Sequence, residues 1–462
     1  MKTIFEPFKI KMVEPIPILT AAERQAAIKT ANFNLFTLPA DTVTFDFLTD
    51  SGTSAMSSAQ WAAMFLGDES YAGSTSYLRF QRTIQDLTGL EHVIPTHQGR
   101  SAEALLCQAL LKPGQRVLGN TQFDTTRANI ESAGGISIDL PDPANKNTQA
   151  EDPFKGNVDL HALKQELEDR SSEVAFFVMT VTNNSVGGQP VSMENLRTTR
   201  QILADYRIPL FIDCARFAEN AYFIKTRELG YAAKSIPSIV SEMFSYADGA
   251  LMSAKKDAFA NIGGFLALKD ARLAEDVRRR MVITEGFPTY GGLAGRDLEA
   301  IATGLDEIQD ESYLSYRIKS VDYFGRGLEE AGLKVVKPLG GHAVYIDAKA
   351  SVPHLAAAQF PAQALAVALY ETIGLRGVEV GSLMFGHKDE ASGEEIPAPQ
   401  ELVRLAFPRR DYNQSHIDAI IEGAHEMASI LDQLPGYRIV EQAKFLRHFT
   451  AKLDRQDCEV QS

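Results

Sequence analysis

Short apolar runs alternate with helical patterns between Met56 and Gly295, and this alternation limits the folds open to the chain. Helical patterns such as Gly99–Leu111 and Met193–Asp205 lie between several of the runs. Strands that alternate with helices predict an α/β fold, in which helices cover both faces of a mostly parallel sheet. The predicted buried strands are Val93–Pro95, Arg116–Leu118, Val174–Thr182, Pro209–Asp213, Gly249–Met252 and Gly264–Leu268.

The pattern changes after Asp297, where apolar residues recur every three or four positions. This spacing predicts a long amphipathic helix that runs towards Gly332, with a looser part beyond Ile308 where the helix can kink. Short strands at Val344–Asp347 and Val403–Ala406 complete a smaller α+β domain. We therefore expect three parts along the chain. They are an N-terminal segment (1–55) that ends in the strand-like Val43–Leu48 and packs with the small domain, a large domain (56–310) and a small C-terminal domain (311–462).

The 462 residues carry a net charge of −14, which limits the partners of the chain. A protein that binds nucleic acid must bring Lys and Arg to the phosphates, and an anionic membrane surface attracts basic segments. The acidic balance therefore argues against both kinds of partner.

The three cysteines, Cys107, Cys214 and Cys458, are too few for a disulfide framework and too far apart for metal-ligand spacing. This usage is typical of a reducing compartment. Lys, Glu and Pro break up the first 18 residues, unlike a secretory signal. No stretch approaches the roughly 18–20 apolar residues of a membrane span. We therefore expect a cytoplasmic protein.

The most informative chemical feature is the lysine pair Lys255–Lys256, which follows a predicted buried strand and precedes Gly263–Gly264. A lysine near apolar surroundings and a second cation can have a lowered pKa, and its neutral amine can then form an imine with a carbonyl. An isolated lysine pair is more often solvated surface charge. The position between two apolar runs favours the functional interpretation.

A second feature is Asp213, at the carboxyl end of the apolar run Pro209–Asp213, with Arg216 close behind it. In open α/β sheets ligands bind outside the carboxyl ends of the strands. A carboxylate there can keep a pyridinium nitrogen protonated, so that the ring accepts electrons. The alternative is an aspartate that only caps the following helix.

The third feature is the turn Thr96–Ser101, between a predicted strand and a predicted helix. Gly99 allows the backbone to approach a phosphate, the helix N-terminus offers free N–H groups, and Arg100 can add a charged contact. Such a turn is weak support alone and is often purely structural. It has neither Walker nor dinucleotide glycine spacing.

The three features follow one another along the chain: first the predicted phosphate-binding turn, then Asp213, then Lys256. Asp213 precedes Lys256 by 256 − 213 = 43 residues. The order and spacing resemble those of the aspartate-aminotransferase-like (fold type I) enzymes, which use pyridoxal 5′-phosphate (PLP). The segment Tyr246–Asp257 further resembles the lysine motif of the β-eliminating lyases. The resemblance extends over nearly the whole chain and includes Phe47–Thr53, Gly67–Ser74, Pro95–Arg100, Gly187–Ser192, Glu219–Lys225, Glu285–Asp297 and Leu446–Leu453.

The resemblance implies a role for each matching residue. Lys256 would hold PLP covalently and later move the α-proton of the substrate. Phe123 would stack on the ring, Asp213 would pair with its nitrogen, and Asn184 and Arg216 would face its phenolic oxygen. The residues that would bind the phosphate are Gln98, Gly99, Arg100, Ser253 and Lys255.

The family also implies substrate and cation sites. Arg404 would clamp the substrate carboxylate, for which an arginine fork is suited, and Tyr71 resembles the family's general acid. The other substrate-binding residues implied are Phe36, Thr49, Ser51 and Val380. A monovalent cation, K⁺ or NH₄⁺, would bind the hard oxygen ligands of Glu69 and of the carbonyls of Gly52 and Asn261.

Three positions separate the two branches of the family. Phenol-lyases carry an arginine that recognises the phenol hydroxyl where this chain has Val380, which cannot donate a hydrogen bond. Phenol-lyases carry threonine where this chain has Asp124, and phenylalanine where it has His448. A carboxylate and an imidazole can both serve proton transfer at an indole ring. Taken alone, His448 is more often a structural histidine, but all three differences favour the indole-lyase branch.

The expected reaction is the β-elimination of L-tryptophan to indole, pyruvate and ammonium by a homotetramer with PLP and a monovalent cation. The alternatives are a phenol-lyase, a PLP aminotransferase and a non-catalytic protein with the same fold. Half-transamination in the presence of a keto acid would identify the aminotransferase. The segment Gly386–Pro399 is expected to be an exposed loop.

Overall fold

The structure is a computed structural model, and it describes residues 4–388, 395–443 and 446–456. The chain forms two compact units, which are described separately here. The large unit comprises Ser51–Ile318 and Arg409–Asp411. The small unit comprises Met1–Asp50, Lys319–Pro408 and Tyr412–Ser462. The domain boundaries expected after residues 55 and 310 stay a prediction.

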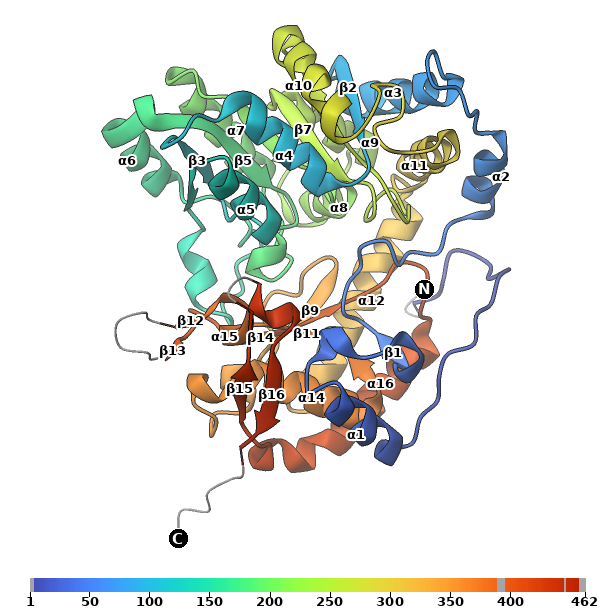
Figure 1. Ribbon diagram of the computed structural model, residues 1–462, viewed down its shortest axis with the longest axis vertical. Helices are drawn as coiled ribbons and strands as arrows, with labels where there is room; N and C mark the ends of the chain where they lie inside the picture. Colours follow the sequence, from blue (N-terminus) through green and yellow to red (C-terminus); the bar gives the residue numbers. More distant parts are fainter. Residues whose placement is uncertain (1–3, 389–394, 444–445, 457–462) are drawn as a thin grey trace. The chain divides into compact units, whose positions relative to one another are not determined.

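A seven-stranded sheet forms the centre of the large unit, in the order β2-β8-β7-β6-β5-β3-β4. Figure 1 labels β2, β3, β5 and β7 of this sheet among the helices that flank it. The strands from β4 to β7 run parallel to their neighbours, whereas β8 is antiparallel to both β7 and β2. The sheet is therefore mostly parallel, as the sequence predicts. Its strands are β2 (His92–Thr96), β3 (Arg116–Gly119), β4 (Ile136–Asp139), β5 (Val174–Thr180), β6 (Leu210–Asp213), β7 (Gly249–Ser253) and β8 (Gly264–Leu268).

Helices cover this sheet on both faces. Phe176 and Val178 point to one face of β5, Phe177 and Met179 point to the other, and all four are buried. Their burial explains why the central strands are continuous apolar runs. The helices of this unit are α2 (Ser58–Leu66), α3 (Thr75–Thr88), α4 (Gly99–Leu110), α5 (Asp124–Ser132), α6 (Leu160–Arg170), α7 (Met193–Asp205), α8 (Phe217–Arg227), α9 (Ile236–Ser245), α10 (Ala271–Thr284), α11 (Gly295–Glu307) and the start of α12 (Glu311–Glu330).

In the large unit, two predicted elements differ from the structure by more than one residue. Strand β5 ends at Thr180, before the predicted end at Thr182, because Thr182 has a φ of 50° and leaves the extended region. The long helix expected after Asp297 is two helices, α11 and α12. Asp310 begins the second one, since its carboxylate accepts the backbone N–H of Ser312 at 3.0 Å.

The small unit contains a three-stranded antiparallel sheet in the order β11-β14-β9, with α14 and α16 among its longer helices. Its core includes residues of α14 that are buried all round the helix, such as Leu365, Val367 and Leu369. The elements of this unit are α1 (Ala21–Thr30), β1 (Phe45–Asp46), β9 (Ala343–Asp347), α13 (Ala348–Ser351), α14 (Pro361–Ile373), β10 (Leu375–Arg376), β11 (Val378–Val380), α15 (Ser382–Phe385), β12 (His387–Lys388), β13 (Glu395–Ile396), β14 (Leu402–Ala406), α16 (Gln414–Met427), β15 (Tyr437–Glu441) and β16 (Lys452–Arg455).

The strand expected at Val43–Leu48 was too long. Only Phe45–Asp46 forms a strand, β1, which pairs in parallel with β10. Phe45 and Phe47 are buried, and an ion pair of 2.5 Å joins Asp46 to Arg376. The segment is therefore fixed mainly by its aromatic side chains and this ion pair.

Three further predictions concern the loop Gly386–Pro399, the state of the cysteines and membrane-spanning helices. Within the expected loop Gly386–Pro399, residues 389–394 lie outside the described residues, as does Cys458. Cys107 and Cys214 are buried free thiols. Among the residues described, no helix combines the length and apolar character that a membrane crossing requires.

Four charged side chains form a buried network in the large unit. One carboxylate oxygen of Glu219 lies 3.2 Å from Arg317 and 2.8 Å from Arg409, and Arg409 lies 3.0 Å from Asp257. The side chains are 0–2% exposed. Burial raises the pKa of Asp257 to about 7, although Arg409 acts in the opposite direction. Because ions in an apolar interior must be paired, each member of this network depends on the others.

Replacing Arg409 with methionine is expected to destabilise the large unit. The change leaves buried carboxylates without their main counter-ion, which costs about 3–5 kcal/mol of unfolding free energy. Urea unfolding followed by the fluorescence of Trp61, the single tryptophan, reports on this unit.

Arg279→Met is the matched control, because Arg279 pairs with Glu275 at the surface, where the two side chains are 67% and 68% exposed. This control should cost less than about 1 kcal/mol. Equal losses in the two variants would show that the network does not stabilise the unit.

Candidate active site

The lysine pair lies in the segment 254–263 between β7 and β8, which we call the lysine turn. Lys255 and Lys256 are half-buried. The turn is closed by the N–H of Ala254, which donates to the carbonyl of Gly263 at 2.9 Å. The N–H of Asp257 donates to the carbonyl of Ala215, just beyond β6, at 3.2 Å. The turn is therefore fixed to the end of the neighbouring strand.

Burial lowers the pKa of Lys255, and the positive charge of Arg100 lowers it further. The guanidinium of Arg100, from α4, and the ammonium of Lys255, from the β7–β8 turn, thus act on the same region. Two cations brought together in this way are suited to an anionic group such as a phosphate.

Asp213 ends β6 and lies among positive partners. Burial raises the pKa of its carboxyl group, while the N–H of Ala215, donated at 3.2 Å, and the charges of Lys256 and Arg216 lower it. A buried carboxylate in this position is further stabilised by a cationic hydrogen-bond donor. A protonated pyridine nitrogen is such a donor, so the acid fits the ring of PLP.

The predicted phosphate turn lies directly against the end of β7. Gly99 begins α4, and a Cβ at this glycine would lie 2.8 Å from the Cβ of Ser253. Only glycine fits this approach, which brings the N-terminus of α4 next to Ser253. Gln98 caps the helix with extended backbone, and Arg100 is exposed. The structure therefore brings together the five residues predicted to bind the phosphate, whose donor chemistry suits that group.

Three further predicted cofactor residues also follow the carboxyl ends of strands. Phe123 precedes α5 after strand β3, Asn184 begins a short 3-10 helix after β5, and Arg216 follows β6. Both Asn184 and Arg216 are buried, and the carbonyl of Arg216 accepts the hydroxyl of Thr182 at 3.0 Å. Asp124 occupies the first position of α5.

Tyr71 lies on an exposed aromatic surface of the large unit. Its side chain is 65% exposed, and its ring lies 5.0 Å from that of Phe287 and 5.4 Å from that of Tyr290. The hydrogen bond with Tyr290 raises the pKa of Tyr71. A raised pKa keeps the phenol protonated, as a proton donor must be.

The predicted cation ligands are only partly together. The carbonyl of Gly52 accepts the side-chain amide of Asn261 at 3.0 Å, and a Cβ at Gly52 would lie 3.1 Å from the carbonyl oxygen of Asn261. Glu69 instead pairs with Arg296 at 3.4 Å. No three His, Cys, Asp or Glu side chains gather into a metal site within the described ranges.

In the small unit, Arg404 and Val380 share one face of the three-stranded sheet. Arg404 on β14 is paired in register with Val378 on β11, and Val380 lies two residues further along β11. The guanidinium of Arg404 donates to the carbonyl of Leu48 at 3.1 Å, next to the half-buried Thr49.

Phe36 and His448 form an aromatic contact in the small unit. Their ring centres are 5.7 Å apart in an edge-to-face arrangement. His448 is buried, and both residues line a small cavity together with Glu379. Ser51, also predicted to bind substrate, is half-buried at the start of the large unit.

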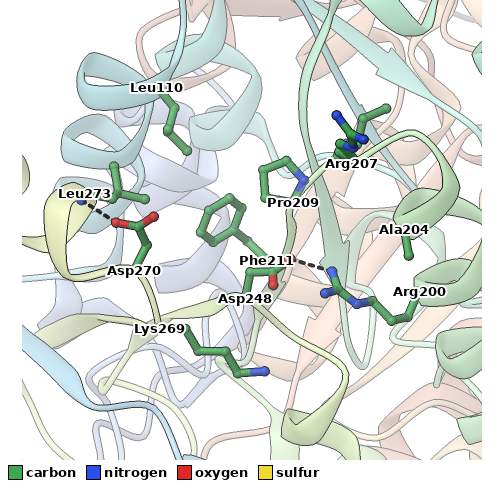
Figure 2. A pocket seen from close by; sticks show the side chains of 11 residues that line it. Leu110, Arg200, Ala204, Arg207, Pro209, Phe211, Asp248, Lys269, Asp270 and Leu273 are labelled. Atoms are coloured by element: carbon green, nitrogen blue, oxygen red, sulfur yellow. Dashed lines mark hydrogen bonds and ion pairs between the residues drawn. The ribbon is translucent and has the colours of Figure 1, made fainter.

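A hollow of about 420 Å³ lies at the opposite edge of the large sheet (Figure 2). It is near the amino ends of β6 and β7, whereas Asp213 and Ser253 stand at their carboxyl ends. The carboxylate of Asp248 in this hollow pairs with Arg200 at 2.5 Å and accepts the N–H of Leu210 at 2.9 Å. None of the predicted site residues lines it.

Sequence reasoning missed two buried groups close to the predicted site, Glu103 and the network around Arg409. Glu103 follows the phosphate turn on α4, and its neighbours Ala102 and Leu106 belong to the core. A charged residue on the apolar side of an amphipathic helix was the signal that could have identified it. Arg409 had no local signal, because its partners lie far away in the sequence.

Comparison with known proteins supports a relationship over almost the full chain. The family described as β-eliminating lyase matches residues 46–422. A tryptophanase of Salinibacter ruber is 56% identical over 453 residues, which cover 98% of this chain and 96% of the relative. A tyrosine phenol-lyase of Clostridium tetani is 47% identical, with 98% of each chain covered.

A solved structure supports the fold. A chain in the crystal structure of a SepCysS–SepCysE N-terminal domain complex has a TM-score of 0.57 at 13% identity, with 84% of this chain and 95% of that chain covered. At this identity the likeness concerns the fold alone. The full-length sequence matches go further, and by them the chain belongs to the β-eliminating lyase family of PLP-dependent enzymes.

Proposed function

We propose that this protein is a tryptophanase, which converts L-tryptophan to indole, pyruvate and ammonium. The observation that carries the proposal is the greater full-length similarity to tryptophanases than to the tyrosine phenol-lyase, 56% against 47% identity. The residues at the three branch positions, Asp124, Val380 and His448, support the same choice.

PLP would be held by the residues at the carboxyl edge of the large sheet. Lys256 carries it, and Asp213 pairs with its ring nitrogen. Phe123 packs on the ring, while Asn184 and Arg216 face its phenolic oxygen. Bound there, PLP would supply an electron-accepting ring for the pair released when the Cα–H bond of the substrate breaks. The residues that hold the phosphate are Gln98, Gly99, Arg100, Ser253 and Lys255.

Two protons must move in this reaction. The amine of Lys256 takes the proton from the substrate Cα. Tyr71 then gives a proton to C3 of the indole, which makes indole a neutral leaving group. Asp124 and His448 assist this second transfer.

Arg404 and the residues predicted with it orient the substrate. The guanidinium of Arg404 binds the carboxylate through two parallel hydrogen bonds. Phe36 lies beside the indole ring, and Thr49 and Ser51 contribute polar groups. Val380 presents no hydrogen-bond donor to the aromatic ring, which suits indole better than a phenol.

The proposal also includes a cation site, an oligomeric state and a cellular location. A monovalent cation, K⁺ or NH₄⁺, would bind the carbonyls of Gly52 and Asn261 together with Glu69. Phe65, Leu66 and Ile283 are 78–89% exposed, and apolar side chains of this size favour burial against other copies of the chain. We infer a cytoplasmic homotetramer that degrades tryptophan.

The first test is product release by the purified protein with PLP and K⁺. L-Tryptophan should yield indole and pyruvate in equal amounts without an added keto acid, and L-tyrosine should yield little phenol. Phenol as the main product would contradict the substrate while leaving the lyase chemistry intact. A requirement for a keto acid would point to an aminotransferase instead.

A second test changes Val380, one of the three positions that separate the two branches of the family. Val380→Arg is expected to raise the ratio of phenol to indole formation by roughly 10- to 100-fold, because a buried donor discriminates strongly for a hydroxyl group. Val440→Arg, at a position 64% exposed in the same unit, is the control and should leave the ratio unchanged. An unchanged ratio in Val380→Arg would contradict the role of this position.

A further inference from the structure

Glu103 is a buried acid that the proposed mechanism does not use. It lies on α4, one turn beyond Gly99, and its residue surface is 6% exposed. The neighbouring Ala102 and Leu106 pack in the apolar core of the large unit. Buried acids require partners, so those of Glu103 are informative about its role.

Three side chains of α5 form hydrogen bonds with Glu103. One carboxylate oxygen accepts the hydroxyl of Thr125 at 2.9 Å and the amide of Asn129 at 3.1 Å, and the other accepts the hydroxyl of Thr126 at 3.0 Å. A carboxylate can accept all three bonds at once. Glu103 therefore joins the first turns of α5 to α4, together with the bond of 3.2 Å that the amide of Asn129 donates to the carbonyl of Arg100.

Thr125 connects Glu103 to Asp124. Its hydroxyl donates to Glu103, and its backbone N–H donates to Oδ1 of Asp124 at 2.6 Å. The same residue thus contacts the buried acid and the side chain expected to assist proton transfer to indole. A shift of Thr125 would move Asp124 with it.

The charges around Glu103 support a site close to the cofactor. Burial and the nearby charge of Asp213 together raise the pKa of Glu103 to about 7, against the hydrogen bonds from α5, which lower it. Asp213 itself faces Lys256 and Arg216. On α4, Cys107 has a pKa raised by burial and by Glu103.

We propose that Glu103 is a positioning residue that holds Asp124 in place for protonation of the leaving indole, by fixing Thr125 and the start of α5. The inference rests on the proposed function, since it assumes that Asp124 assists this transfer. Glu103 does not touch the substrate in this role. It acts through Thr125.

The test compares two substrates that differ in their need for an acid. Indole leaves only when its C3 gains a proton. From β-chloro-L-alanine, chloride leaves with its electron pair and needs no proton, and the other products are again pyruvate and ammonium. A defect in placing Asp124 should therefore affect tryptophan selectively, whereas a general loss of structure affects both substrates.

Glu103→Gln should lower kcat/KM for L-tryptophan about 10- to 100-fold more than for β-chloro-L-alanine, the loss typical of a misplaced catalytic group. Glu131→Gln, an exposed acid near the end of α5, should leave the ratio of the two activities unchanged. Thr125→Val removes only the hydroxyl and should show part of the selective loss, which keeps the test possible if Glu103→Gln does not fold.

The variant Asp124→Asn distinguishes a failure of the proposed function from a failure of the inference about Glu103. In its background, Glu103→Gln should cause no further selective loss, because both changes act on one group. A wild-type enzyme that releases no indole, or an Asp124→Asn enzyme with no selective loss, would contradict the proposed function. A normal selective loss in Asp124→Asn with equal losses on both substrates in Glu103→Gln would overturn the inference about Glu103 alone.

Discussion

The ion pair between Arg409 and Asp257 is the contact on which the lysine turn depends. Asp257 follows Lys256 directly, and its carboxylate also accepts the backbone N–H of Ala218 at 2.9 Å. This one side chain therefore fixes the turn between β7 and β8 to the start of α8, and Arg409 supplies the charge that makes its burial tolerable. The anchor adds to the backbone bond from Asp257 to Ala215, and together they hold Lys256 near the end of the strand that carries Asp213.

Parallel strands bring the other groups to the same edge. Strands β3, β5, β6 and β7 all run in one direction, so the residues that follow them meet at their carboxyl ends. Each strand end contributes a different function: Phe123 an aromatic surface, Asn184 an amide, Asp213 an acid and Lys256 an amine. The close approach of Gly99 to Ser253 then adds the N-terminus of α4.

The features of the fold and of the site that depend on a local sequence pattern could be predicted from the sequence. Apolar runs identified the central strands, and the residues at their ends identified the candidate site. What failed depends on partners remote in sequence: the strand expected at Val43–Leu48 was limited to two residues because its pairing with β10 is short. The burial of Glu103 had a local signal, but its partners become recognisable only once α5 is packed beside α4. The roles of the site residues themselves stay predictions.

The return of residues 409–411 to the large unit has a consequence for synthesis of the chain. Asp257 precedes Arg409 by 152 positions, so it leaves the ribosome long before its counter-ion exists. Until then, Glu219 and Asp257 have only Arg317 within the network to balance them. The large unit can thus acquire its sheet early, but the lysine turn reaches its final electrostatic state only after Arg409 has been synthesised.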